Sequence, residues 1–233
     1  MINILYLYPH LMNLYGDYAN ITVLKKHLED QGLKVRVDKK DVGDIINFSN
    51  YDFIYMGSGT ESNQLVALND LLKYKDSLND CINSNKVILF TGNAMELLGK
   101  SIDDKEALGI FDFSTKIIDK RLTGDVIVKS RELGPIVGFI NKSSLIEGGE
   151  TEKLFNYIFM DSNLQDNAYE GYTRNNTFGT HVIGPVLVKN PRFMEKIVQL
   201  LLPEGVEYNK IDYKYEKSSY EITLKALKER SKW

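Results

Sequence analysis

The first hundred residues repeat one pattern, which constrains the fold more than any other feature of the sequence. Short strand-like runs are each followed by a polar or glycine-containing loop and then by a segment with helical spacing. Strand–helix alternation with short loops predicts a parallel sheet covered by helices on both faces. The expected strands are residues 2–8, 34–38, 51–56 and 86–91. The expected helices are residues 18–30, a leucine-rich helix after residue 61 that runs towards Ile82, and a short one ending at 99.

The loops that follow the strands carry most of the polar and glycine residues in this half. In open α/β sheets, ligands bind beyond the carboxyl ends of the strands. We therefore expect the loops at residues 8–15, 57–61 and 92–95 to converge on one crevice. Asp17, directly before the first helix, is of the residue type that caps helices, and we expect it to do so.

From Phe113 the pattern changes to short β segments, which predict an antiparallel extension of the sheet. A helix is expected at 191–202 and a peripheral amphipathic helix at about 215–230. Without a linker or repeat, the chain reads as one domain, residues 1–233. The expected segments of the extension are 115–119, 125–129, 136–140, 168–173 and 177–183.

Composition excludes several classes of protein. With 43% hydrophobic and 26% charged residues and a net charge of −3, the chain has ordinary globular composition and lacks the basic excess of a nucleic-acid-binding protein. No apolar run approaches the roughly 20 residues of a membrane span, so no membrane insertion is expected. The start of the chain reads as a strand, not a signal peptide. The single cysteine favours a reducing compartment. We expect a cytoplasmic protein with no cofactor and no metal.

Several segments, in order and spacing, resemble the cobyric acid synthase-type class I glutamine amidotransferases, and most closely the glutaminase subunits of lipid II isoglutaminyl synthase. Each segment alone is weak, but the resemblance runs from about residue 4 to 190. The segments are Leu7-Tyr8-Pro9, Asn13-Leu14-Tyr15-Gly16-Asp17, Leu108-Gly109-Ile110-Phe111-Asp112-Phe113, Arg121-Leu122-Thr123-Gly124-Asp125, Val137-Gly138-Phe139, Gly179-Thr180 and Gly184-Pro185-Val186-Leu187.

This resemblance implies a flavodoxin-like three-layer α/β fold, with a mostly parallel sheet and a short antiparallel extension. It also implies glutamine hydrolysis, with the ammonia used by a Mur-ligase-type, ATP-dependent partner that amidates the D-glutamate of lipid II in peptidoglycan. The family nucleophile is a cysteine in the pattern Cys-Gly-Gly-Tyr-Gln-x-x-Gly, and the base is a histidine in the pattern Tyr-x-His-Gly-Pro.

Both catalytic positions differ in this chain. The first pattern aligns with residues 92–99, which places Gly92 at the cysteine position, and the second places Ile183 at the histidine position. Glycine has no nucleophilic atom and isoleucine cannot accept a proton, while acyl transfer requires both functions. Because an elbow residue is held in a strained backbone conformation, Gly92 would also relieve strain.

Other residues offer poor replacements for the missing pair. Cys81 precedes a strand, so we expect it at the wrong edge of the sheet, in a half-buried helix. Thr91 and His181 lie next to the two lost positions and could form a relocated pair, although threonine is a poor nucleophile. His10 is expected in a solvated loop and His27 on the surface of the first helix.

Some binding elements remain. The resemblance assigns Arg121 to the α-carboxylate of glutamine, which a guanidinium binds well, although a structural ion pair is equally plausible. It assigns the segment Gly57-Ser58-Gly59 to oxyanion stabilisation, but its middle glycine is Ser58 here, and a plain turn fits as well. Of the family's Glu-Asn-His motif, only Asn141 remains.

Three hypotheses follow from the sequence. The first, which we favour, is a glutamine amidotransferase-like subunit that cannot hydrolyse glutamine and acts as scaffold or regulator of a Mur-ligase-type partner. The second is an active or residual glutaminase that supplies ammonia through relocated residues. The third is a non-catalytic module that binds an amino acid such as glutamine.

Overall fold

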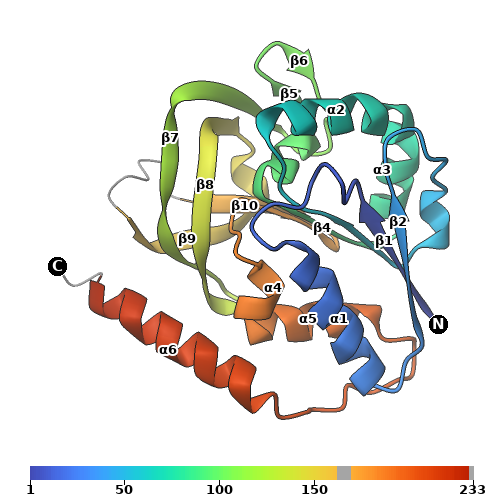
Figure 1. Cartoon of the computed structure of the whole chain (residues 1–233), viewed down its shortest axis with the longest axis vertical. Helices are drawn as coiled ribbons and strands as arrows, with labels where there is room; N and C mark the ends of the chain where they lie inside the picture. Colours follow the sequence, from blue (N-terminus) through green and yellow to red (C-terminus); the bar gives the residue numbers. More distant parts are fainter. Residues whose placement is uncertain (162–168, 231–233) are drawn as a thin grey trace.

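The computed structural model describes residues 1–161 and 169–230 of the chain. Its strands form one sheet in the order β2-β1-β3-β4-β11-β10-β9-β7-β5-β6, with β8 paired to β7 (Figure 1). Strands β1 (Ile2–Leu7), β2 (Val35–Lys40), β3 (Phe53–Met56), β4 (Val87–Thr91) and β11 (Thr177–Thr180) form the parallel part.

Helices cover both faces of the parallel part, because successive residues of its central strands are apolar and point alternately to opposite faces. One face packs Leu5, Ile54 and Phe90 beneath α2 (Glu61–Leu71) and α3 (Lys75–Asn83). The other packs Ile4 and Leu89 beneath a second set of helices. That set comprises α1 (Tyr18–Asp30), α4 (Val186–Lys189) and α5 (Pro191–Leu201), seen together in Figure 1. The three-layer α/β class is confirmed.

The antiparallel part is built on a long hairpin, β7 (Phe113–Ser130) with β8 (Gly134–Gly148), that rises beside the parallel sheet (Figure 1). It has longer strands than the sequence indicated, because a register shift between Ile117 and Leu122 bends β7 without ending it. Residue 168 of one predicted segment lies outside the described residues. The other strands are β5 (Ser101–Ile102), β6 (Lys105–Glu106), β9 (Lys153–Met160) and β10 (Tyr169–Arg174).

Short 3-10 helices account for other departures from the predicted elements. The predicted leucine-rich helix that runs towards Ile82 is two helices, joined by η2 (Leu72–Tyr74). The segment after β4 is a 3-10 helix, η3 (Gly92–Leu98), and two more are η1 (Phe48–Asn50) and η4 (Glu150–Glu152).

Helix α6 (Lys214–Arg230) lies along the outside of the hairpin, far from the N-terminus (Figure 1). Leu227 packs against Ile127 and Val137 of the hairpin, and the Tyr220 hydroxyl donates to the Pro135 carbonyl at 2.8 Å. These contacts join α6 to the hairpin.

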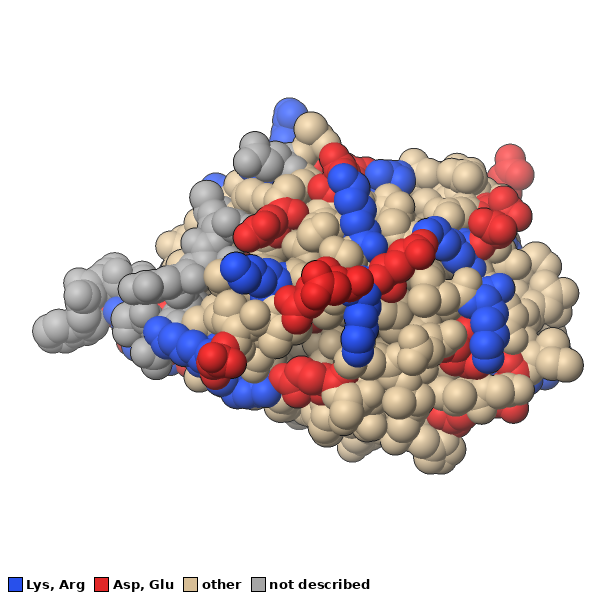
Figure 2. All heavy atoms as spheres, turned by 90° about the horizontal axis from the view of Figure 1, so that it is seen from above, with Lys and Arg blue, Asp and Glu red and all other residues tan. Residues whose placement is uncertain are grey.

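Charge is mixed on the face that carries α2 and the β5–β6 hairpin. Among its described residues, Lys and Arg side chains alternate with Asp and Glu (Figure 2). A nucleic-acid backbone is bound by clustered basic side chains, so this face offers it little attraction. Over the described ranges, no helix combines enough length and apolarity to cross a bilayer.

Candidate functional site

The junction of β4 with η3 has the geometry of a nucleophile elbow. Gly92 lies at this junction with φ of +61°, a conformation that glycine adopts without steric penalty. A Cβ atom built on Gly92 would overlap Ser58 Oγ, and would lie 2.8 Å from Ser58 Cβ and 3.2 Å from Ile183 Cγ2. The structure therefore brings Gly92 and Ile183 face to face, and Ser58 fills the space between them.

Asp17 holds Ser58 in this place. The Ser58 backbone N–H donates to Asp17 Oδ2 at 2.5 Å, and both side chains are buried. Asp17 forms no side-chain cap with α1, so the prediction that it caps this helix is wrong: its carboxylate binds the loop after β3 instead. Burial raises the pKa of Asp17 to about 6, although the hydrogen bond from the Ser58 backbone opposes the shift.

The loop predicted to stabilise an oxyanion uses two of its backbone donors internally. The Ser58 N–H binds Asp17, and the Gly59 N–H donates to Asn93 Oδ1 at 2.9 Å. Asn93 Nδ2 donates back to the Gly59 carbonyl at 3.0 Å. Gly57 lies against the Asp17 side chain, where an added Cβ would lie 2.7 Å from Asp17 Oδ2. The Gly57-Ser58-Gly59 loop is thereby fixed to the elbow and to α1.

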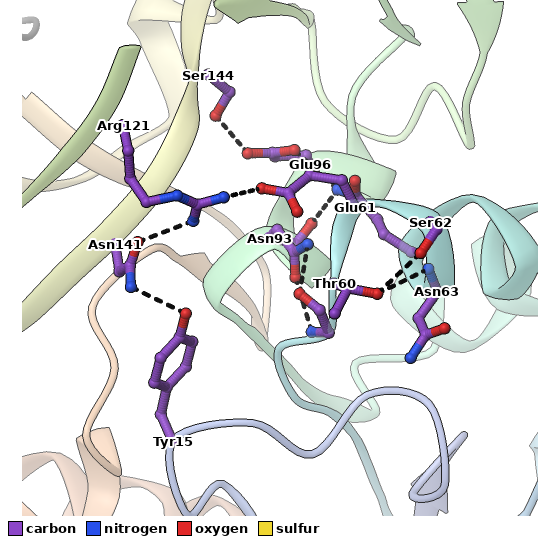
Figure 3. A network of polar contacts seen from close by, with 12 residues as sticks. Tyr15, Thr60, Glu61, Ser62, Asn63, Asn93, Glu96, Arg121, Asn141 and Ser144 are labelled. Carbon is purple, nitrogen blue, oxygen red and sulfur yellow. Dashed lines mark hydrogen bonds and ion pairs between the residues drawn. The ribbon is translucent and has the colours of Figure 1, made fainter. Parts of the chain in front are cut away.

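Arg121 lies across the mouth of the site and bonds within the protein (Figure 3). Its Nη2 donates to Glu61 Oε1 at 2.6 Å and its Nη1 to Asn141 Oδ1 at 2.9 Å. Asn141 Nδ2 donates in turn to the Tyr15 hydroxyl at 3.0 Å. Arg121 and Glu61 are each 48% exposed. The guanidinium therefore joins α2 to the hairpin, as the structural alternative considered from the sequence requires.

Little space remains behind this contact. The cavity lined by Ser58, Asn93, Glu96 and Arg121 has a volume of about 20 Å³. That is room for about one water molecule, whereas sites for small-molecule ligands measure roughly 300–1,000 Å³. In this conformation the site does not admit an amino acid.

A buried ionic cluster forms the floor of the site. His181 lies between two carboxylates: its Nε2 is 3.1 Å from Glu96 Oε1, and its Nδ1 is 3.6 Å from Glu170 Oε1. Its backbone N–H also donates to Glu170 Oε1 at 2.6 Å. The Ser144 hydroxyl donates to Glu96 Oε1 at 2.5 Å, and Gln64 Nε2 donates to Glu96 Oε2 at 2.7 Å. Every one of these side chains is buried.

The cluster is charged, and each group sets the state of the others. Burial would raise the pKa of Glu96, but the hydrogen bonds and charge of His181, with bonds from Ser144 and Gln64, lower it below its usual value. Burial and the nearby Lys142 act to lower the pKa of His181, but Glu170 and Glu96 outweigh them and raise it. Glu96 and Glu170 therefore favour the protonated form of His181, against the burial that disfavours it.

The proposed relocated pair is not assembled. Thr91 Oγ1 shares a hydrogen bond of 3.0 Å with the Tyr55 hydroxyl, while both ring nitrogens of His181 face carboxylates. Cys81 lies on α3, before β4. The prediction of a half-buried side chain is wrong, because the side chain is buried, and this burial raises the pKa of its thiol. Cys81 thus lies at the edge of the sheet opposite to the elbow.

The other two histidines have different surroundings. His10 is 84% exposed and pairs with Asp41 at 2.6 Å, as expected of a loop residue. The prediction of a surface His27 is wrong, because Tyr213 stacks on its ring at 3.8 Å and Glu216 pairs with it at 3.1 Å. The peripheral α6 segment, which sequence spacing alone cannot place, covers it.

Sequence reasoning missed Glu96, Glu170 and Ser144. One signal was present: Glu96 stands where the family pattern has glutamine, so a charge replaces an amide next to the elbow. Glu170 and Ser144 come from strands that meet only in the fold. Among the described residues, no group of three or more His, Cys, Asp or Glu side chains is arranged to hold a metal ion.

Comparison with known proteins agrees with this geometry. Residues 3–191 match the CobB/CobQ-like glutamine amidotransferase domain. The chain is 30% identical over 224 residues to the lipid II isoglutaminyl synthase (glutamine-hydrolyzing) subunit GatD of Staphylococcus aureus, covering 92% of this chain and 88% of that protein. It is 28% identical over 209 residues to the Streptococcus pneumoniae subunit of the same name, covering 86% and 80% of the two chains.

Solved structures support the fold. PurLQS from Thermotoga maritima superposes with a TM-score of 0.56 at 13% identity, covering 96% of this chain and 99% of that one. A crystal structure of a glutamine amidotransferase superposes with a TM-score of 0.57 at 12% identity, covering 84% and 98%. The fold is therefore that of the class I glutamine amidotransferases.

The buried Asp17 predicts a pH-dependent stability difference for Asp17→Asn. Because the folded protein holds the Asp17 proton more tightly than the unfolded chain, the parent loses stability as pH rises from about 4 to about 6. At about 1.4 kcal/mol per pH unit of pKa difference, the penalty approaches about 3 kcal/mol above pH 6. In urea unfolding from pH 4 to 8, the free energy of unfolding of Asp17→Asn should rise relative to that of the parent between about pH 4 and about pH 6. A difference that stays constant over this range would contradict the raised pKa of Asp17.

The ionic cluster predicts a large cost for His181→Ala, because the change removes the side chain that contacts both buried carboxylates. The free energy of unfolding should fall by about 3–5 kcal/mol at pH 7, measured by urea denaturation. Because the pKa of His181 is raised, the stability it contributes is present below its ordinary pKa and is lost as pH rises through the raised value. The control His10→Ala should change stability by less than about 0.5 kcal/mol.

Proposed function

Because the chain belongs to the CobB/CobQ-like glutamine amidotransferase family, we propose that it is an amidotransferase-like subunit that does not hydrolyse glutamine. In this proposal it acts as a scaffold or regulator of an ATP-dependent, Mur-ligase-type partner in peptidoglycan D-glutamate amidation. The curated relatives are named as subunits of lipid II isoglutaminyl synthase, which supports both the pathway and the existence of a partner.

One observation carries the proposal: the two positions that face each other at the elbow hold Gly92 and Ile183. Hydrolysis of a γ-amide through an acyl-enzyme requires a nucleophile to attack the carbonyl carbon and a base to take its proton. Neither side chain supplies an atom for these roles. When nucleophile and base act as a unit, loss of either removes most of the rate enhancement.

The surroundings support loss of activity beyond the two substitutions. Ser58 occupies the volume into which the nucleophile side chain would project, and the loop's Ser58 and Gly59 N–H groups are bound to Asp17 and Asn93. Those donors are not free to stabilise an oxyanion, and oxyanion stabilisation is a major contribution to the rate of enzymatic acyl transfer. The chain thus keeps the backbone shape of the elbow without a working site.

The two alternatives from the sequence receive less support. A residual glutaminase using Thr91 and His181 would need side chains that already bond to Tyr55 and to two glutamates. An amino-acid-binding module would need the Arg121–Glu61 pair to open, because the cavity behind it holds about 20 Å³. Neither has an observation in its favour comparable to the filled elbow.

The proposal predicts the behaviour of a reconstituted complex. Co-expressed with a Mur-ligase-type subunit from the same genome, the chain should co-purify with it, and the complex should amidate lipid II with ammonium but not with glutamine. The Staphylococcus aureus relative, whose name specifies glutamine hydrolysis, is the positive control. Glutamine-dependent amidation would refute the loss of hydrolysis, and failure to associate would refute the scaffold role.

The filled elbow predicts that restoring the cysteine requires a second change. Gly92→Cys should lower the free energy of unfolding by about 1–3 kcal/mol for the positive φ and by a similar amount for the overlap with Ser58. In the background Ser58→Gly, which removes the overlapping hydroxyl, the same substitution should cost only the φ term. Urea unfolding of the four proteins forms the cycle; equal costs in both backgrounds would show that Ser58 does not fill the site.

A further inference from the structure

A ligand-sized cavity lies on the α1 side of the sheet, apart from the elbow. It has a volume of about 500 Å³, which is within the usual range for small-molecule sites. Its lining shares no residue with that of the elbow cavity. The loop after β1 contributes Pro9, His10 and Asn13 at the carboxyl end of β1, the end of a parallel strand where ligands bind in such folds.

One face of α1 forms a wall of this cavity. Tyr18, Ile21, Thr22 and Lys25 line it with the spacing i, i+3, i+4 and i+7, which places them on one side of the helix. The Tyr18 side chain is a large aromatic group that is 58% exposed, whereas Ile21 on the same face of α1 is buried. A planar ring could stack against it at little conformational cost.

Tyr6 supplies a polar group at the floor. Tyr6 lines the cavity and is 2% exposed, and its hydroxyl has no hydrogen-bond partner among the described residues. Burial, with the charges of Asp17 and Asp41, holds the pKa of Tyr6 above its usual value, so the hydroxyl remains a donor at neutral pH. An unpaired buried donor costs free energy, which an acceptor on a ligand would recover.

Two lysines bring positive charge to the same cavity. Lys39 is directly opposite Tyr6 in the β1–β2 ladder, so both side chains project from the same face of the sheet. Over the described ranges Lys39 has no ion-pair partner, and Lys25 has only a long contact of 3.7 Å with Glu29. The acidic groups that act on Tyr6 are Asp17 and Asp41, neither of which lines the cavity, and Asp41 pairs with His10 at 2.6 Å.

From this lining we infer that the cavity is a second binding site, for a small organic anion that carries a planar ring, of the size and class of a nucleoside monophosphate. The lysines would bind the phosphate through charge-assisted hydrogen bonds. Tyr18 would contact the ring, and the Tyr6 hydroxyl would donate to an acceptor on it. The inference does not depend on the proposed function, since the two sites share no lining residue.

Isothermal titration calorimetry with adenosine monophosphate at low salt tests the inference, with adenosine and inorganic phosphate as the separate halves of the probe. We expect the intact probe to bind at least tenfold more tightly than either half. The variant Lys25→Gln/Lys39→Gln should weaken binding at least tenfold. Lys26→Gln is the matched control, because Lys26 lies on the same helix, pairs with Asp30 at 2.5 Å and does not line the cavity.

Tyr6→Phe separates binding from folding, because it removes only a hydroxyl that has no partner in the part of the chain that the structure describes. The substitution should leave the unfolding midpoint unchanged or raise it, and it should weaken binding of adenosine monophosphate severalfold. The inference is overturned if adenosine and uridine monophosphate both bind more weakly than about millimolar, if the double lysine variant binds as the parent does, or if adenosine alone binds as tightly as its phosphate.

Discussion

The buried contacts of His181 with Glu96 and Glu170 tie together the elements on which the site depends. Glu96 belongs to the elbow helix η3, Glu170 to β10 and His181 follows β11, while Ser144 of the hairpin and Gln64 of α2 complete the bonding. Charges are costly to bury unless they are paired and hydrogen-bonded. This cluster therefore fixes the register in which the antiparallel part meets the parallel sheet, and with it the position of the elbow.

Around that floor, the site keeps the backbone shape of an elbow, with no cysteine at position 92 and no histidine at position 183. Gly92 retains the left-handed backbone of an elbow, and Ile183 faces it, but the space between them is filled by Ser58. Asp17 fixes Ser58 from below and the Arg121–Glu61 pair covers the mouth. Functions of an amidotransferase subunit that depend on its surface do not require the elbow chemistry, so a scaffold role is compatible with this closed site. The ligand-sized volume lies instead beside α1.

Much of the fold could be predicted from the sequence, because strand–helix alternation is a local signal. Helix α1 matches the predicted residues 18–30, and the three-layer class follows from the same pattern. The long hairpin was harder: β7 contains polar stretches such as Asp119-Lys120-Arg121, which read as a break, and only pairing with β8 keeps them in a strand.

The candidate site was predictable only in part. The family pattern located Gly92 and Ile183, and the structure brings them together. Side-chain partners were not predictable, because they depend on contacts between distant segments. Asp17 is of the residue type that caps helices, yet its carboxylate accepts a hydrogen bond from Ser58, which lies 41 positions away in the sequence. The position of His27 on α1 predicts a surface side chain, yet Tyr213 and Glu216 cover it.

The central claim, that no nucleophile stands at the elbow, is tested most directly by covalent labelling. A chloroketone analogue of glutamine alkylates the activated nucleophile of a glutaminase, and intact-protein mass spectrometry counts the adducts. We expect no stoichiometric adduct on this chain, and a single adduct on the Staphylococcus aureus relative labelled in parallel. A single adduct that glutamine protects against, mapped to Ser58, Thr91 or His181, would contradict it.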